Sequence, residues 1–163
     1  MTKRRTSSHN SPEAKTTKSR EQQKQKVYLI DFGLGTYFID QRTGEHVRER
    51  RKQVFVGTAG FSSLNSHLLK EQSRRDDLES LAYIMIYLVN GKLPWHGLPP
   101  VKDRHQRYNQ ITQKKMQTKP EDLITQDMPD EFFLFYQYCR GLEFEQCPDY
   151  GYLHRLLRDL IHA

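Results

Sequence analysis

The stretch from Ser73 to Gly91 constrains the fold of this chain more than any other part of the sequence. Ser73 is a typical helix N-cap, and acidic residues follow it where the positive end of a helix dipole favours them. Apolar residues recur at helical spacing from Leu78 to Val89 and fill most of the other positions as well. Gly91 suits the C-cap. The pattern predicts a helix that is apolar on nearly all sides and lies buried at the centre of a domain.

Charge is distributed unevenly along the 163 residues. The formal net charge is +6, and residues 1–26 account for all of it, since residues 27–163 carry equal numbers of basic and acidic side chains. Residues 1–26 contain only Met1 and Ala14 from the apolar set, too little to offset the entropy of ordering. We therefore predict a disordered basic tail, or an expanded hairpin loop, at 1–26 and a folded domain at 27–163.

The remaining elements follow from shorter patterns. The apolar run Val27–Ile30 ends at Asp31-Phe32-Gly33 and predicts a buried strand that delivers an acidic residue to a turn. A second strand is expected at 35–38, followed by a long exposed loop over 39–54. Further helices are predicted over residues 63–69, 101–117, 129–142 and 149–162. The fold class is thus α+β and mainly α-helical, with a minimal strand pair and about six helices.

Cysteine usage and hydropathy bear on the compartment. The chain has two cysteines, Cys139 and Cys147, which we expect to be a core thiol and a loop thiol, and no apolar segment near Met1. The longest apolar run, residues 81–89, is too short to cross a bilayer. We expect a cytoplasmic or nuclear protein without a membrane partner. A neutral body and a tail without Phe, Trp or Tyr argue against nucleic acid as a partner.

Six short motifs occur in order along residues 27–163. They are Asp31-Phe32-Gly33-Leu34, Gly57-Thr58-Ala59, Ser63-Leu64-Asn65, the string from Glu71 to Leu81, Leu93-Pro94-Trp95 and Pro148-Asp149-Tyr150. Together they resemble the casein kinase I family of Ser/Thr protein kinases. The string from Glu71 to Leu81 is the most specific part. Ser63-Leu64-Asn65 stands where most protein kinases have Ala-Pro-Glu, a replacement that is itself a mark of casein kinase I.

The resemblance implies a partial protein kinase domain, the large lobe from the metal-binding strand to the final helix. In the longer family members ATP and Mg²⁺ support transfer of the γ-phosphate to protein Ser/Thr. By this match Asp31 is the magnesium ligand, Gly33 is the hinge beside it in the cofactor site, and Thr58 contacts the catalytic aspartate. These 163 residues contain no Gly-rich loop, no strand lysine and no catalytic-loop Asp and Asn. We therefore expect the chain to be inactive alone and to bind neither ATP nor Mg²⁺.

The resemblance also assigns structural roles. Asp77 matches the central-helix aspartate that steadies the backbone of the catalytic loop. Arg140 matches an arginine that pairs elsewhere with the glutamate of Ala-Pro-Glu. Because Asn65 stands at that glutamate position, the partner of Arg140 is left open.

An anion pocket for acidic or phosphate-primed protein substrates is the last feature that the resemblance implies. Arg107 and Gly97 match part of this pocket. Gly60 departs from the family, which usually carries an arginine there, so we expect weakened phosphate recognition. The other cations of the same predicted helix are interpreted as a solvated face, together with Arg107: Lys102, Arg104, Lys114 and Lys115. The histidines show no metal-ligand spacing.

Three functional hypotheses remain. The first is a casein kinase I-type kinase, monomeric and seen here as a truncated, inactive fragment. The alternative is a non-catalytic, partner-binding kinase lobe. The third is a nucleic-acid-binding or nuclear-targeting protein with a basic tail on a degenerate scaffold. Met1 fits an internal methionine of the hairpin before Asp-Phe-Gly, which leaves open whether the gene model is incomplete or the truncation is real.

Overall fold

The computed structural model describes residues 26–125 and 127–162, without the side chain of His162. The chain divides into two compact units, Met1–Gly33 and Leu34–Ala163. Residues 1–25, and with them nearly all of the predicted basic tail, lie outside the described residues. The prediction of disorder for residues 1–26 therefore stays a prediction.

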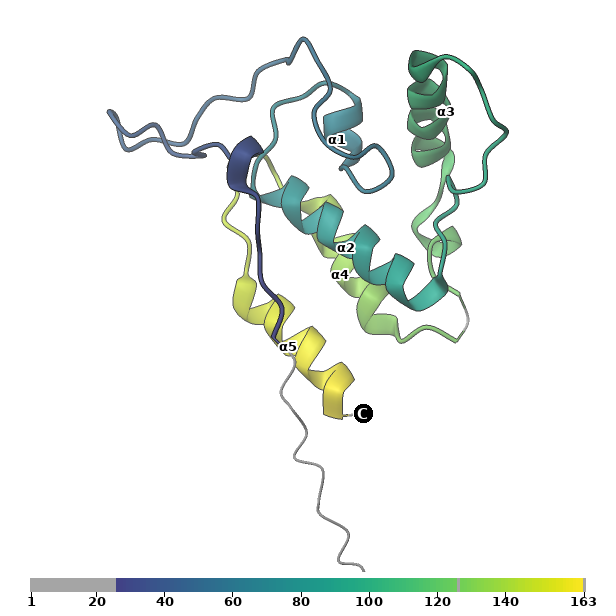
Figure 1. The fold of residues 1–163 in the computed structure, drawn as a ribbon. Coiled ribbons are helices and arrows are strands. Elements are labelled where there is room, and N and C mark those ends of the chain that lie inside the picture. Colours follow the sequence, from purple (N-terminus) through teal and green to yellow (C-terminus); the bar gives the residue numbers. More distant parts are fainter. Residues whose placement is uncertain (1–25, 126, 163) are drawn as a thin grey trace, which may run out of the picture. The chain divides into compact units, whose positions relative to one another are not determined.

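The second unit is built mainly from α-helices (Figure 1). The elements in chain order are η1 (Phe32–Leu34, at the boundary of the units), α1 (Leu64–His67), α2 (Arg74–Asn90), α3 (Arg104–Gln117), η2 (Pro120–Asp122), α4 (Asp130–Gly141) and α5 (Tyr150–His162). Strand pairing in the described ranges is limited to two isolated bridges, Ile39 with His46 and Arg51 with Lys70. None of the described helices is long and apolar enough to cross a membrane.

The predicted central helix is confirmed as α2, with both of its caps. The backbone N–H of Ser73 donates to the carboxylate of Asp76 over 2.9 Å at the start of the helix. At the other end Gly91 has φ 70°, the left-handed conformation that glycine adopts without strain, and its N–H bonds the carbonyl oxygen of Tyr87. These contacts satisfy backbone groups that a helix end leaves free.

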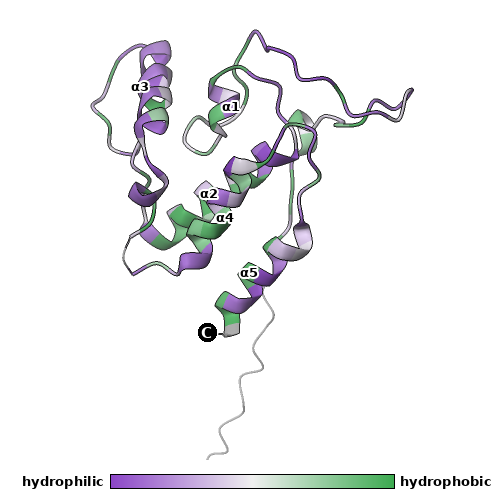
Figure 2. Ribbon diagram, turned by 180° about the vertical axis from the view of Figure 1, so that it is seen from behind, coloured by the Kyte–Doolittle hydropathy of each residue, from purple (hydrophilic) through white to green (hydrophobic). Residues whose placement is uncertain are grey.

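The core lies between α2 and α4, which pack along each other (Figure 1). From α2 it takes Ala82, Tyr83 and Ile86, and from α4 it takes Phe135 and Cys139, all nearly inaccessible to solvent. Cys139 is therefore the predicted core thiol, and burial raises its pKa to about 12. Figure 2 shows apolar positions along α2 and α4, whereas α3 is mostly hydrophilic.

The expectation that α2 is buried on nearly all sides is wrong. Leu81 and Ile84 are about two-fifths exposed, and Leu88 is 74% exposed. With Asp77, which is also exposed, these residues are spaced by four, three and four positions and share one side of the helix. The sequence pattern could not reveal this, because an apolar side chain is equally apolar whether or not a neighbouring element covers it.

The predicted strand at Val27–Ile30 is also wrong. These residues are extended but unpaired, and Val27 is 98% exposed. A strand needs a partner for its backbone hydrogen bonds, and no described residue supplies one here. The second predicted strand, residues 35–38, is likewise irregular, so the described chain is mostly helical with little strand.

The other predicted helices are confirmed with shifted ends. α3 begins at Arg104 and not near Val101, because the carboxylate of Asp103 accepts from the N–H groups of His105 and Gln106 and caps the helix there. The loop over 39–54 is irregular, as predicted, with a turn at Gly44.

Candidate functional site

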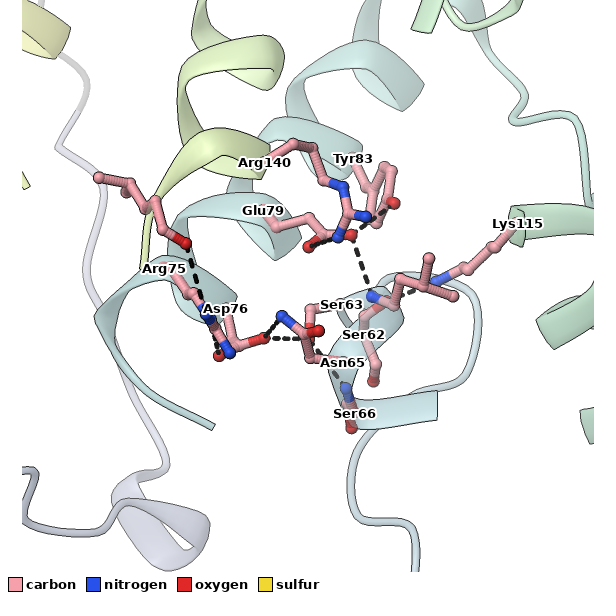
Figure 3. A network of polar contacts seen from close by, with 12 residues as sticks. Ser62, Ser63, Asn65, Ser66, Arg75, Asp76, Glu79, Tyr83, Lys115 and Arg140 are labelled. Atoms are coloured by element: carbon pink, nitrogen blue, oxygen red, sulfur yellow. Dashed lines mark hydrogen bonds and ion pairs between the residues drawn. The ribbon is translucent and has the colours of Figure 1, made fainter. Parts of the chain in front are cut away.

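The backbone from Ala59 to Ser66 comprises a turn and the first three residues of α1, and is here called the anchored loop. It is held by side chains of α2, α3 and the segment that follows α2. The indole N–H of Trp95 donates to the carbonyl oxygen of Gly60 over 2.7 Å. The ammonium group of Lys115 donates to the carbonyl oxygen of Ser62. Figure 3 shows part of the resulting polar network. Its partners lie far apart in the sequence, so only the folded chain brings them together.

Asp76, in the first turn of α2, is the first buried acid of this network. Its side chain is 1% exposed. Oδ1 accepts from the hydroxyl of Ser63 at 2.7 Å and from the amide of Asn65 at 3.1 Å (Figure 3). Oδ2 accepts from the backbone N–H of Ser73. Three donors compensate for removing this carboxylate from water. Asp76 thereby ties the anchored loop to the start of α2.

Glu79 is the second buried acid and lies one turn further along α2. Its Oε1 accepts from the backbone N–H of Leu64 at 2.9 Å and from the hydroxyl of Tyr83 at 2.7 Å. Its Oε2 forms an ion pair with Arg140 of α4 at 2.9 Å (Figure 3). Glu79 therefore connects three parts of the fold: the anchored loop, α2 and α4.

The contacts of Glu79 supply the partner of Arg140 that the sequence left open. Arg140 pairs with a carboxylate of α2, and Asn65 bonds Asp76 instead. Burial alone would lower the pKa of Arg140, but the charge and hydrogen bond of Glu79 raise it above its ordinary value. Burial, and then the negative charge of Glu79, raise the pKa of Tyr83 well above its ordinary value.

Lys115 is the buried cation of the network. The prediction that it belongs to a solvated helix face is wrong, since it is only 5% exposed. Its ammonium lies 4.7 Å from the ring centres of both Tyr83 and Trp95. Burial lowers the pKa of Lys115 to about 7, against the opposing charge of Glu79. The spacing of four residues from buried Ile111 on α3 was the available sequence signal for an inward position.

His67 closes the network at the end of α1. Its Nε2 donates to the carbonyl oxygen of Ala59 at 2.9 Å, and its Nδ1 lies 2.8 Å from the hydroxyl of Thr112 on α3. Burial, and then the charge of Lys115, lower its pKa to about 4, although the bond to Ala59 acts in the other direction. His67 is therefore neutral near pH 7 and acts as a structural link.

Asp31 belongs to the first unit, Met1–Gly33. It is exposed, has φ 61°, and accepts from the N–H of Gly33 over 3.3 Å. The described residues contain no group of three or more His, Cys, Asp or Glu side chains that could hold a metal ion. Magnesium ordinarily needs substrate phosphates beside one or two carboxylates, so the residues present here do not by themselves fit a metal and nucleotide site.

Thr58 and Asp77, the other two residues matched to catalytic support, are both exposed. The carbonyl oxygen of Thr58 accepts from the N–H groups of Phe61 and Ser62, which turns the chain into the anchored loop. Partial burial, and then the charge of Asp76, raise the pKa of Asp77. Neither side chain forms a hydrogen bond with a described residue.

The structure brings Arg107 against the loop that follows Gly97. The guanidinium of Arg107 donates to the carbonyl oxygen of Leu98 at 3.0 Å. A Cβ at Gly60 would lie 3.4 Å from Nε2 of His96. Burial, and then the charges of Lys115 and Arg107, lower the pKa of His96. His96 thus lies beside the position where the resemblance expects an arginine.

Sequence patterns did not single out Glu79, Lys115, His67 or His96 as members of one site, because their partners are distant along the chain.

No known protein-family model matches the sequence.

Proposed function

We propose that residues 27–163 are part of the large lobe of a casein kinase I-type Ser/Thr protein kinase. A protein that carried these residues together with a phosphate loop, a strand lysine and a catalytic loop would transfer the γ-phosphate of ATP to protein Ser/Thr. The 163 residues alone would not, because positioning and electrostatic stabilisation supply nearly all kinase catalysis and need those groups together.

The observation that carries this proposal is the exchange of partners around Asn65. At the position where other protein kinases have the loop glutamate that binds this arginine, the chain has Asn65, so Arg140, whose side chain is 33% exposed, needs another carboxylate as its partner. Glu79 of α2 forms the ion pair with Arg140, and Asn65 donates a hydrogen bond to Asp76. The string around Glu79, the most specific part of the resemblance, thus contributes the side chains that anchor the loop.

A second observation supports the proposal from the outer side of α2. Asp77 is assigned by the resemblance to hold the catalytic loop, and it shares its exposed side with Leu81, Ile84 and Leu88. An exposed apolar stripe of this kind marks a surface that another segment covers. The kinase proposal expects the missing part of the lobe, the part with the catalytic loop, to cover it.

The test uses the chain alone and a fusion. The purified chain should show no saturable ATP binding by calorimetry with Mg²⁺ and no transfer of phosphate to casein. A casein kinase I small lobe and catalytic loop fused ahead of Val27 should restore both activities, and Asp31→Asn should abolish them in the fusion. Phosphate transfer by the unfused chain, or a folded fusion without activity, would refute the proposal.

A non-catalytic, partner-binding lobe is the second candidate, favoured by the exposure of Leu88 in the isolated chain. Leu88→Asp separates the two. If the stripe is covered by the catalytic part of the lobe, this substitution leaves the free chain folded but impairs the fusion. A fusion that keeps full activity with Leu88→Asp would favour the second candidate.

A further inference from the structure

Arg51 and Lys70 are held opposite each other by a short antiparallel backbone pairing. The N–H of Lys52 donates to the carbonyl oxygen of Leu69 at 2.6 Å, and the N–H of Glu71 donates to that of Arg50 at 2.7 Å. Both hydrogen bonds flank the Arg51–Lys70 pair, which is therefore the non-hydrogen-bonded kind in which opposite side chains lie closest. The fold places two cations side by side.

This arrangement is electrostatically unfavourable, because like charges directly opposite each other destabilise a strand pair. Both side chains are exposed, and neither forms an ion pair with a described residue. The nearby carboxylates are engaged elsewhere: Glu71 pairs with Lys52, and Glu49 pairs with Arg75, each at 2.9 Å. Arg51 and Lys70 therefore have no carboxylate partner among the described residues and remain accessible to an external anion.

Further cations and a pocket adjoin this pair. Arg48 and Arg50 are exposed and also lack ion pairs within the described residues. They help to line an open pocket of about 400 Å³, whose lining also includes the acids Asp40, Glu45 and Glu71 but neither Arg51 nor Lys70. Leu69, next to Lys70, has φ 56°, a left-handed conformation that is uncommon for leucine. A left-handed residue, Leu69, therefore directly precedes Lys70 in the pair.

We propose that Arg51 and Lys70 form a binding site for a phosphorylated Ser or Thr side chain of an extended peptide. A phosphate monoester carries the nearly double negative charge that two adjacent cations fit, and its oxygens accept charge-assisted hydrogen bonds. This site is separate from the anchored loop and from Arg107, and it does not depend on the proposed kinase relationship.

A peptide is favoured over a nucleic acid by the surroundings of the pair. The N–H and C=O of Arg51 point away from Lys70 and carry no hydrogen bond among the described residues, so an extended peptide backbone can pair with them. A nucleic acid backbone would present one phosphate after another, and its binding needs a run of cations. Here Glu49 and Glu71 interrupt the run.

The test measures binding of the full chain to a short fluorescein-labelled peptide with one phosphoserine, by fluorescence anisotropy. The unphosphorylated peptide, inorganic phosphate and a single-stranded oligonucleotide serve as competitors. Each of Arg51→Thr and Lys70→Thr should weaken phosphopeptide binding about tenfold, the loss of one charge-assisted contact. Lys92→Thr, at an exposed cation elsewhere, is the matched control and should bind as the wild type does.

Each outcome supports or overturns the proposal. A variant with both Arg51→Thr and Lys70→Thr should no longer bind the phosphopeptide. If it still binds, other cations hold the phosphate and the proposal is overturned. Equal affinity for the unphosphorylated peptide would also overturn it. Tighter, Arg51-dependent binding of the oligonucleotide would overturn it in favour of nucleic acid. Should a threonine variant fail to fold, Arg51→Lys keeps the charge and must still bind the phosphopeptide more tightly than the unphosphorylated peptide, because lysine binds phosphate as a point charge. None of these measurements involves phosphate transfer, so a failure here leaves the kinase proposal to its own test.

Discussion

The two sides of α2 differ in what covers them. One side carries Asp76, Glu79 and Ile86, each no more than 2% exposed, and its acids are bound by the anchored loop and by α4. The other side carries Leu81 and Leu88, which are exposed. The buried side thus contains two acids that have partners, while the exposed side carries Asp77 and an apolar stripe. Burial on α2 follows the partners available to a side chain and not its hydropathy alone.

The largest expected effect comes from placing the same charge on each side. Ile86→Asp puts a carboxylate without a partner into the core between α2 and α4, which costs several kcal/mol and should prevent folding. Leu88→Asp makes the same kind of change two residues away, where the side chain is 74% exposed. Its Tm, followed by circular dichroism, should stay within a few degrees of the wild type. Equal losses of structure would contradict the difference between the two sides.

Removing Glu79 should have the next largest effect. Glu79→Ala leaves Arg140 without its carboxylate and the N–H of Leu64 without its acceptor. Because Glu79 is buried but the side chain of Arg140 is 33% exposed, the loss should be about 2 to 3 kcal/mol. Urea unfolding of the variant measures this loss. In the Arg140→Met background the further loss caused by Glu79→Ala should be clearly smaller, because the ion pair is already gone. Fully additive losses would show that the two side chains do not act as a pair.

The buried Lys115 should make the free energy of unfolding depend on pH. Its pKa is lowered to about 7 in the folded chain, so the folded state releases this proton before the unfolded state does, and stability should rise as pH rises above 7. Between about pH 7 and pH 8.5 the wild type should gain about 1.5 kcal/mol relative to Lys115→Met, measured by urea unfolding. Lys114→Met, at the neighbouring lysine outside the network, is the control. A constant difference between wild type and Lys115→Met would show that Lys115 stays charged.

Local signals predicted the helices better than they predicted their surroundings. Ser73 and Gly91 marked both ends of α2 because a cap acts on its own helix. The side of α2 that faces the core and the inward position of Lys115 were missed. These depend on partners such as Arg140, which is 61 residues from Glu79, and no local pattern records such a contact.

The strand predicted at Val27–Ile30 failed for the same reason as the all-round burial of α2. Its continuous run of apolar side chains, with β-branched and aromatic residues among them, favours a strand, but a strand exists only where a second segment accepts its hydrogen bonds. For the candidate site, the resemblance drew attention to Asn65 and Arg140 but left the partner of Arg140 open. That Arg140 pairs with Glu79, and that Asn65 bonds Asp76, could be found only from coordinates.

The smallest expected effect is that of Asp77→Asn, and it is measured against the same change at the adjacent Asp76, which the sequence makes look alike. Asp76→Asn weakens three hydrogen bonds to a buried carboxylate and should lower the free energy of unfolding by about 2 kcal/mol. Asp77→Asn changes an exposed side chain and should alter the free energy of unfolding by no more than about 0.5 kcal/mol. Urea unfolding of both variants at one pH measures the contrast. Because the charge of Asp76 contributes to the raised pKa of Asp77, removing the second charge also relieves a repulsion, so a slight stabilisation by Asp77→Asn agrees with this account. A loss at Asp77 as large as that at Asp76 would mean that Asp77 is bound within the free chain. Its exposed side could then not be the surface left for the catalytic part of the lobe.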